Sequence, residues 1–286
     1  MDGYSSAPRP IQAGVPQGSP PAPTLFNLFT HDIPKSAQNE LYLFADDIAI
    51  THTAKNPETI TRHLQNNLDQ IQTWMNEWKI SVNPNKTKVV FFSKARLTGP
   101  AGSIRLLNQQ LPWCYSVKYL GLVFDKKLNW HETVADRIKN ANRQAAALYP
   151  LICSKSKLSL KVKLLMYNIM IRSILTYGAP TWCSTKPTHL KKIQRLQNRL
   201  LRQISNSPRY LRTYIIHRQL NQPTIHEFFD KITDKYYNKV DAHSNRLITT
   251  SHVAARKVHH ASPCCLKLSL QLLNRDFQTA LIPKGA

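Results

Sequence analysis

Residues 41–50 read LYLFADDIAI, an apolar run interrupted by two adjacent carboxylates, Asp46 and Asp47. Five apolar residues precede the acids and three follow them, which predicts a buried β-hairpin with the acids near its turn. Burying adjacent carboxylates is costly unless a cation neutralises them, and Mg²⁺ prefers such oxygen ligands. Taken alone, the run is explained better by an ordinary turn than by a metal site. In such a turn the Asp side chains accept hydrogen bonds from local backbone amides.

A second motif, AGVPQGSP at residues 13–20, precedes these acids in the chain. Gly14 and Gly18 would let the backbone approach a ligand closely, and Gln17 offers both a donor and an acceptor. Ser19 provides a capping hydroxyl ahead of a proline-rich segment, so we expect a helix to begin here. Ordinary turn chemistry would also explain this loop. The ordered combination of the loop and the paired acids is what points to a site.

The remaining pattern changes character along the chain. Apolar spacing predicts a long helix over 57–79, then strands over 86–92 and 117–124 with Gly121 as a bend or bulge. Beyond residue 129 the apolar residues recur with the helical period. The predicted helices cover 134–148, 160–177, 190–204 and 225–240, and the second, apolar on more than one side, is expected to be central. The fold class is therefore α+β.

Charge is distributed unevenly over the 286 residues, whose net charge is +23. Residues 1–50 hold two basic and five acidic side chains, whereas residues 131–286 hold 26 basic and seven acidic ones. An acidic beginning and a basic remainder suggest a polyanionic partner and a separate carboxylate-bearing site. No apolar run approaches the ~20 residues of a transmembrane helix, so no membrane association is expected. The hydrophobic content of 42% is sufficient for a folded core.

GVPQGSP followed by LYLFADDIAI resembles the reverse transcriptases of non-LTR retrotransposons, closest to the jockey-type LINE elements. The likeness continues in NPNKTK at 83–88, VKYLGL at 117–122, ILTYG at 174–178 and PRYLR at 208–212. It implies a partial right-hand polymerase palm, an antiparallel sheet with helices, over residues 1–128. An all-α thumb-like region over 129–250 would follow, and then a basic, poorly defined tail over 251–286.

The resemblance also implies roles for individual residues. It implies two Mg²⁺ ions held by Asp46, the principal ligand, with Asp47 assisting, and it implies that Lys86 protonates pyrophosphate. An ordinary solvated lysine at a strand start explains Lys86 as well. The implied nucleotide and template contacts are Gln17, Gly18 and Ser19. The implied primer contacts are Tyr119, Leu120 and Gly121, although core packing would also explain the first two.

The expected partners are an RNA template, a DNA primer and deoxynucleoside triphosphates, and the expected location is inside the cell, in the nucleus. The sequence does not indicate an oligomeric state. Polymerases of this kind need a third catalytic aspartate on a palm strand upstream of the glycine-bearing loop. Asp2 is the only carboxylate before Gln17, and its surroundings do not resemble that strand. We therefore expect the carboxyl-terminal portion of a polymerase that is inactive by itself.

A row of cations in the basic half favours a second hypothesis. Along one face of the predicted helix 190–204 lie Lys191, Arg195, Arg199 and Arg202. Such a row could follow a phosphate backbone, although a solvated helix face has the same pattern. The high positive charge of the region favours nucleic-acid contact. The alternative function is thus a non-catalytic nucleic-acid-binding module.

Overall fold

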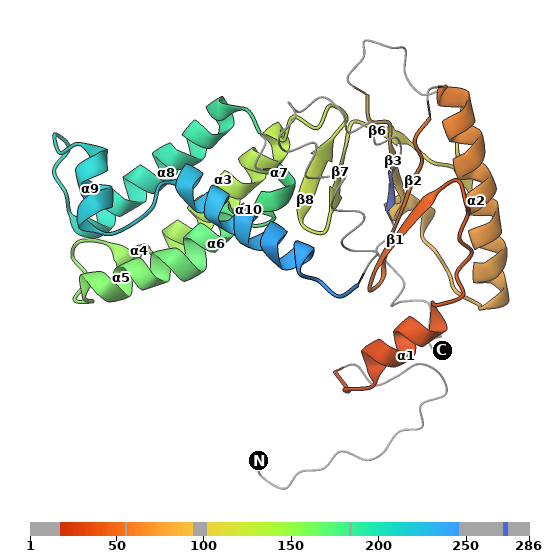
Figure 1. The fold of residues 1–286 in the computed structure, drawn as a ribbon, viewed down its shortest axis with the longest axis horizontal. Coiled ribbons are helices and arrows are strands. Elements are labelled where there is room, and N and C mark those ends of the chain that lie inside the picture. The colour runs from red at the N-terminus through yellow and green to blue at the C-terminus, as the bar shows by residue number, and fades with distance from the viewer. Residues whose placement is uncertain (1–17, 55, 94–101, 183–184, 246–270, 274–286) are drawn as a thin grey trace, which may run out of the picture. The chain divides into compact units, whose positions relative to one another are not determined.

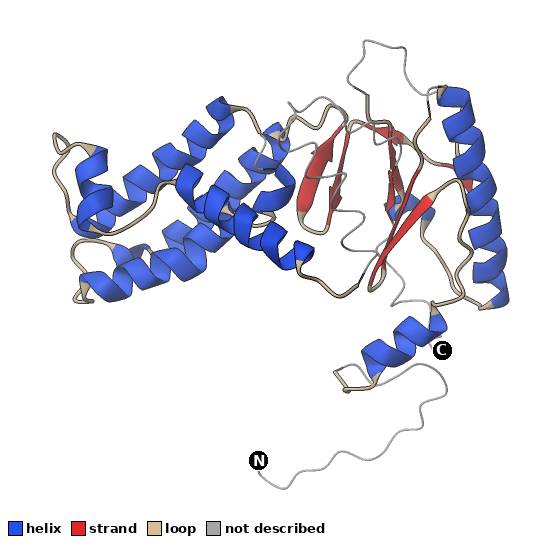
Figure 2. Cartoon of the chain, in the orientation of Figure 1, coloured by secondary structure: helices blue, strands red, loops and turns tan. Residues whose placement is uncertain are grey.

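The computed structural model describes residues 18–54, 56–93, 102–182, 185–245 and 271–273. Helices and short sheets are combined in the chain, as the α+β prediction requires (Figure 2). Two compact units are present, residues 1–117 with 267–286, and residues 118–266. The boundary predicted at residue 128 lies further along the chain, beyond a hairpin that clusters with the helices of the second unit.

The first unit is built around one hairpin and one long helix. Strands β1 (Glu40–Phe44) and β2 (Asp47–Thr51) are antiparallel, and helix α2 (Pro57–Glu77) follows them (Figure 1). Asn56 caps α2 by accepting a hydrogen bond from the Glu58 amide at 3.0 Å. The apolar stripe of α2 and the buried side chains of β2 belong to one hydrophobic cluster. The other elements are α1 (Ala22–Phe29), η1 (Pro84–Lys86), β3 (Lys88–Val90), β4 (Arg105–Leu106), β5 (Gln109–Gln110), β6 (Trp113–Cys114) and β9 (Gln271–Leu273).

Two predictions for this unit need correction. The hairpin is buried only along β2, because β1 pairs with β2 alone within the described residues and leaves Phe44 61% exposed. Ser19 does not cap α1, whose N-cap is Pro21 and which begins without a side-chain capping bond. The prolines themselves fix the backbone at this helix start, so the hydroxyl is not needed there.

The second unit is mainly helical. Its hairpin consists of β7 (Ser116–Tyr119), within which the unit begins, and β8 (Leu122–Asp125). The described residues that follow form α3 (His131–Ala147), α4 (Tyr149–Ile152), α5 (Leu160–Met166), η2 (Tyr167–Arg172), α6 (Ser173–Leu175), α7 (Ala179–Trp182), α8 (Pro187–Ser205), α9 (Thr213–Gln219) and α10 (Ile225–Asp241). Buried side chains from most of these helices form one continuous core.

The predicted helix 160–177 is continuous in direction but not central. It consists of α5, the π-helical turn η2 and α6, and its inner face buries Tyr167, Ile171 and Leu175 completely. The opposite face leaves Leu165 55% and Ile169 62% exposed. The expectation of a central position was therefore wrong: apolar residues surround the helix, but only one face has a covering layer among the described residues. None of the described helices combines the length and apolarity that crossing a membrane requires.

Candidate functional site

The paired acids lie at the tip of the β1–β2 hairpin, as predicted. Phe44 is paired with Asp47, which leaves Ala45 and Asp46 as a two-residue turn. Ala45 has a φ of +49°, a left-handed conformation that costs an L-residue about 1–2 kcal/mol. Both carboxylate side chains are half-buried. The buried β2 strand thus holds two acids at the tip of a turn that leaves both partly open to solvent.

These carboxylates are the type of ligand that a divalent cation prefers, but two of them are too few to complete its coordination. Carboxylate oxygens are the ligands that Mg²⁺ prefers, and two of them stand side by side at the turn. Across the described ranges, no group of three or more His, Cys, Asp or Glu side chains is placed to hold a metal. A Mg²⁺ ion at the hairpin would therefore need oxygen ligands from water, substrate or another segment.

The predicted nucleotide loop is seen only in part. Gln17 lies outside the described residues, so its expected proximity to Asp46 remains a prediction. Gly18 is exposed, has a φ of +83°, and has open space where a Cβ would project. The Ser19 hydroxyl is buried with no hydrogen-bond partner in the described part of the chain.

Lys86 ends the short helix η1 and is exposed. Asn83 begins η1, and its side chain accepts a hydrogen bond from the Asn85 amide at 3.0 Å. The predicted strand over 86–92 is shorter than expected, because β3 starts at Lys88. Lys86 therefore belongs to a turn at the strand entrance, where its ammonium keeps access to solvent.

The predicted primer contacts form the tip of the β7–β8 hairpin. Leu120 and Gly121 have φ angles of +45° and +79°, the pair of positive values that defines a type I′ turn. Gly121 is thus part of the turn rather than a bulge inside a strand. A Cβ at this position would lie 3.2 Å from Cε1 of Tyr177, so the turn and that ring are in close contact.

Arg137 of α3 and Tyr177, in the turn between α6 and α7, hold this hairpin turn by its carbonyl groups. The Tyr177 hydroxyl donates to the Leu120 carbonyl at 3.0 Å, and the Arg137 guanidinium donates to the Gly121 carbonyl at 2.5 Å. Arg137 also pairs with Asp136 at 2.8 Å and lies 5.3 Å from the centre of the Tyr177 ring. These contacts fix a backbone turn whose two carbonyls would otherwise bind water.

Replacing Tyr177 with Phe is expected to lower the free energy of unfolding by about 0.5–1 kcal/mol, because one hydrogen bond to a partly solvated carbonyl is lost. Urea denaturation followed by circular dichroism measures the change. Tyr210→Phe is the matched control, since Tyr210 is 87% exposed, and it should leave stability unchanged. Equal effects of the two substitutions would show that the turn does not depend on the Tyr177 hydroxyl.

The predicted cationic row lies on α8, but its members differ in their contacts. Lys191 and Arg195 are exposed, and Arg199 is exposed while donating to Asn142 Oδ1 of α3 at 2.6 Å. Arg202 is half-buried and donates to the carbonyls of Pro208 and Leu211. It therefore closes the loop between α8 and α9, and its guanidinium is the least available of the four for a phosphate.

Sequence reasoning missed the part that Arg137 plays. Tyr177 stands in a stretch that carried the family resemblance, but Arg137 is one arginine among many in a basic helical region. The only available signal is that Arg137 occurs on the same face of the helix as Val134 and Ala141, where a charged side chain must be paired.

Comparison with known protein families extends this description. A family described as reverse transcriptase (RNA-dependent DNA polymerase) matches residues 1–124. The chain is 32% identical over 263 residues to the RNA-directed DNA polymerase from mobile element jockey of Drosophila melanogaster, covering 89% of this chain and 28% of that protein. Identity to the jockey polymerase of Drosophila funebris is 33% over 270 residues, covering 92% of this chain and 29% of that protein.

A third relative is the probable RNA-directed DNA polymerase from transposon X-element of Drosophila melanogaster. It is 30% identical over 242 residues, which are 83% of this chain and 26% of that protein. The chain thus spans between a quarter and a third of the length of these relatives. No solved structure matches it.

Proposed function

We propose that this chain, which belongs to the reverse transcriptase family of non-LTR mobile elements, is the segment of an RNA-directed DNA polymerase that carries the catalytic hairpin and the helices after it. The observation that carries the proposal is the Asp46–Asp47 pair at the tip of the β1–β2 turn, inside the region that matches the family. The first unit would be part of the palm and the second a thumb-like region.

In this proposal Asp46 and Asp47 hold Mg²⁺, with Asp46 as the principal ligand. Bound there, the metal would promote attack by the primer 3′-hydroxyl and stabilise the leaving pyrophosphate. Asp46 occupies the turn, and Asp47 is the first residue of β2. The unequal roles of the two acids are those that the resemblance to reverse transcriptases implies.

The remaining contacts are assigned by their places in the two hairpins and loops. Gln17, Gly18 and Ser19 would shape the nucleotide and template pocket. Tyr119, Leu120 and Gly121 would support the primer end, with the turn held in place by Arg137 and Tyr177. Lys86, exposed at the entrance to β3, would donate a proton to pyrophosphate. The proposed partners are an RNA template, a DNA primer and deoxynucleoside triphosphates, and the proposed location is the nucleus.

Replacement of the matching segment in a jockey-type polymerase by residues 1–286 tests this function. We expect the resulting enzyme to extend a DNA primer on an RNA template when Mg²⁺ is present. A chimera that folds and binds primer and template, but extends nothing, would contradict the proposal. It would favour the alternative function, a non-catalytic nucleic-acid-binding module, which the exposed cations of α8 support.

Both functions predict a salt-dependent contact along α8. Because each lost phosphate contact reduces the slope of log affinity against log salt by about 0.7–0.9, Lys191→Gln with Arg195→Gln should reduce it by about 1.4–1.8. Fluorescence anisotropy with a labelled oligonucleotide at several salt concentrations gives the slope. Lys231→Gln with Lys235→Gln, an exposed pair on α10, is the matched control. If both pairs change the slope equally, α8 has no specific contact with the strand.

A further inference from the structure

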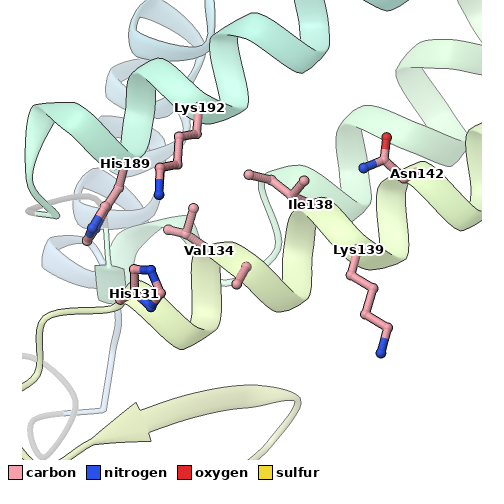
Figure 3. Close-up of a pocket in the computed structure, with 8 residues that line it drawn as sticks. His131, Val134, Ile138, Lys139, Asn142, His189 and Lys192 are labelled. Atoms are coloured by element: carbon pink, nitrogen blue, oxygen red, sulfur yellow. The ribbon is translucent and has the colours of Figure 1, made fainter.

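A groove of about 500 Å³ lies between α3 and α8 in the second unit, and the functions proposed above do not use it (Figure 3). Its floor contains Val134 and Ile138 of α3. One end holds His131 of α3 with His189 and Lys192 of α8, and Lys192 extends from α8 toward α3. The side chains that line the groove include no carboxylate.

The histidine pair is the most constrained part of this groove. The rings of His131 and His189 have their centres 5.6 Å apart and meet edge to face. His189 is only 8% exposed, and its Nδ1 lies 2.9 Å from the Thr185 hydroxyl oxygen. Its Nε2 has no hydrogen-bond partner among the described residues, although the ring lines the groove. Because the ring lines the groove, its Nε2 is in a position to meet a ligand.

The backbone adds positive potential at the same end. His131 is the first residue of α3, and His189 is the third residue of α8. Neither helix has a side-chain capping bond at its start. A helix N-terminus carries about half a positive charge, and two such ends meet beside the histidines and Lys192. This combination of side chains and helix ends favours an anion.

The surrounding charges explain why His189 would take up a proton when the anion binds. The pKa of His189 is lowered first by burial and then by the positive charges of His131, Lys192 and Lys186. Asp125 on β8 opposes this effect, and its carboxylate accepts hydrogen bonds from the amides of Asn129 and Trp130, just before α3. Glu132 is in the first turn of α3, and Lys139 extends away from α8.

The Thr185 hydroxyl determines which nitrogen of His189 takes that proton. It lies 3.5 Å from the Asn129 carbonyl, to which it donates, and so it accepts from Nδ1–H of His189. In the neutral ring Nε2 is then unprotonated and can only accept. An anion at Nε2 needs a donor, so its binding requires the imidazolium form and raises the pKa of His189.

We propose that His131, His189 and Lys192 bind one phosphate of a single-stranded nucleic acid, whose adjoining nucleoside lies along Val134 and Ile138. The choice of a phosphodiester among possible anions rests on the proposed function. A single strand fits better than a duplex, because its sugars and bases are free to contact the apolar floor of the groove. A duplex would bring only its phosphates to that floor. The groove is also of the size that small ligands occupy.

Anisotropy of a fluorescein-labelled ten-nucleotide oligo-uridylate, measured with the full chain, tests this site. Lys192→Gln should weaken binding about fivefold at pH 6, the size of one lost charge-assisted contact. Affinity should rise as the pH falls from about 7.5 to 5.5, because His189 must be protonated to donate to the phosphate, and His189→Gln should remove much of that rise. The matched controls are Lys231→Gln and His226→Gln on α10, both exposed, and each should change affinity less than twofold.

Histidine NMR titration gives a second readout that does not depend on affinity. Adding the oligonucleotide should raise the pKa of His189. If Lys192→Gln and His189→Gln behave like their controls, or polyglutamate raises the pKa of His189 equally, the site is not a nucleic-acid site. If these tests fail while Lys191→Gln with Arg195→Gln still reduces the salt slope, the proposal for this groove is wrong. The proposed function would not be affected by that result.

Discussion

Replacing Asp46 with asparagine should reduce RNA-templated primer extension by the chimeric polymerase at least 1,000-fold, which corresponds to about 4 kcal/mol of transition-state stabilisation. The substitution keeps the size of the side chain but removes the charge that would hold Mg²⁺. The turn itself should survive, because Ala45, not Asp46, has the positive φ angle. The rate is measured by single-turnover extension of a labelled primer.

Two control substitutions separate metal binding from a general loss of acidic charge. Asp69→Asn removes a carboxylate from an exposed position on α2 and should leave extension within about twofold. Asp47→Asn should reduce extension less than Asp46→Asn, because Asp47 has the assisting role. If Asp46→Asn and Asp69→Asn reduce primer extension equally, the hairpin acids have no specific role in catalysis.

Replacing Gly178 with alanine should lower the free energy of unfolding of the second unit by about 2–5 kcal/mol. Gly178 has a φ of +66°, which costs an L-residue about 1–2 kcal/mol. A Cβ there would also lie 2.9 Å from Cδ1 of Leu122, and such overpacking costs about 1–3 kcal/mol. Because Leu122 is on β8, the substitution would push the hairpin away from the helices. Urea denaturation measures the effect.

A double-mutant cycle with Leu122→Ala distinguishes the two costs. Shortening Leu122 opens space for the new methyl group, so Gly178→Ala should cost only the backbone part, about 1–2 kcal/mol, in that background. A cost that is the same in both backgrounds would mean that the hairpin and the Tyr177-Gly178 corner are not in close contact.

The Asp46–Asp47 turn could be predicted because a short apolar run broken by two acids has few other solutions. The exposure of β1 could not be predicted, because every residue of LYLF is apolar. The pattern therefore has no polar face that would indicate a solvent-exposed side of the strand. The same limit made the helix over 160–177 look central. In both cases burial depends on whether another layer is present, and sequence periodicity does not record that.

The contacts that organise the second unit depend on long-range packing. Leu120 has a positive φ angle, which is uncommon for leucine. Arg137 contacts its turn from α3, and Tyr177 contacts it from the turn between α6 and α7. The spacing that aligned Arg202 with three other cations was correct as helical geometry. It could not show that the next loop would place two carbonyls against that guanidinium. The groove between α3 and α8 likewise exists only after the two helices meet.

Paramagnetic broadening by Mn²⁺, used in place of Mg²⁺, tests most directly whether the hairpin acids are metal ligands. In an amide NMR spectrum of the full chain, substoichiometric Mn²⁺ should broaden the signals of residues 45–48 first, and Asp46→Asn should abolish that selectivity. Broadening that is strongest elsewhere, or that persists unchanged in Asp46→Asn, would contradict the assignment of this turn as the catalytic metal site.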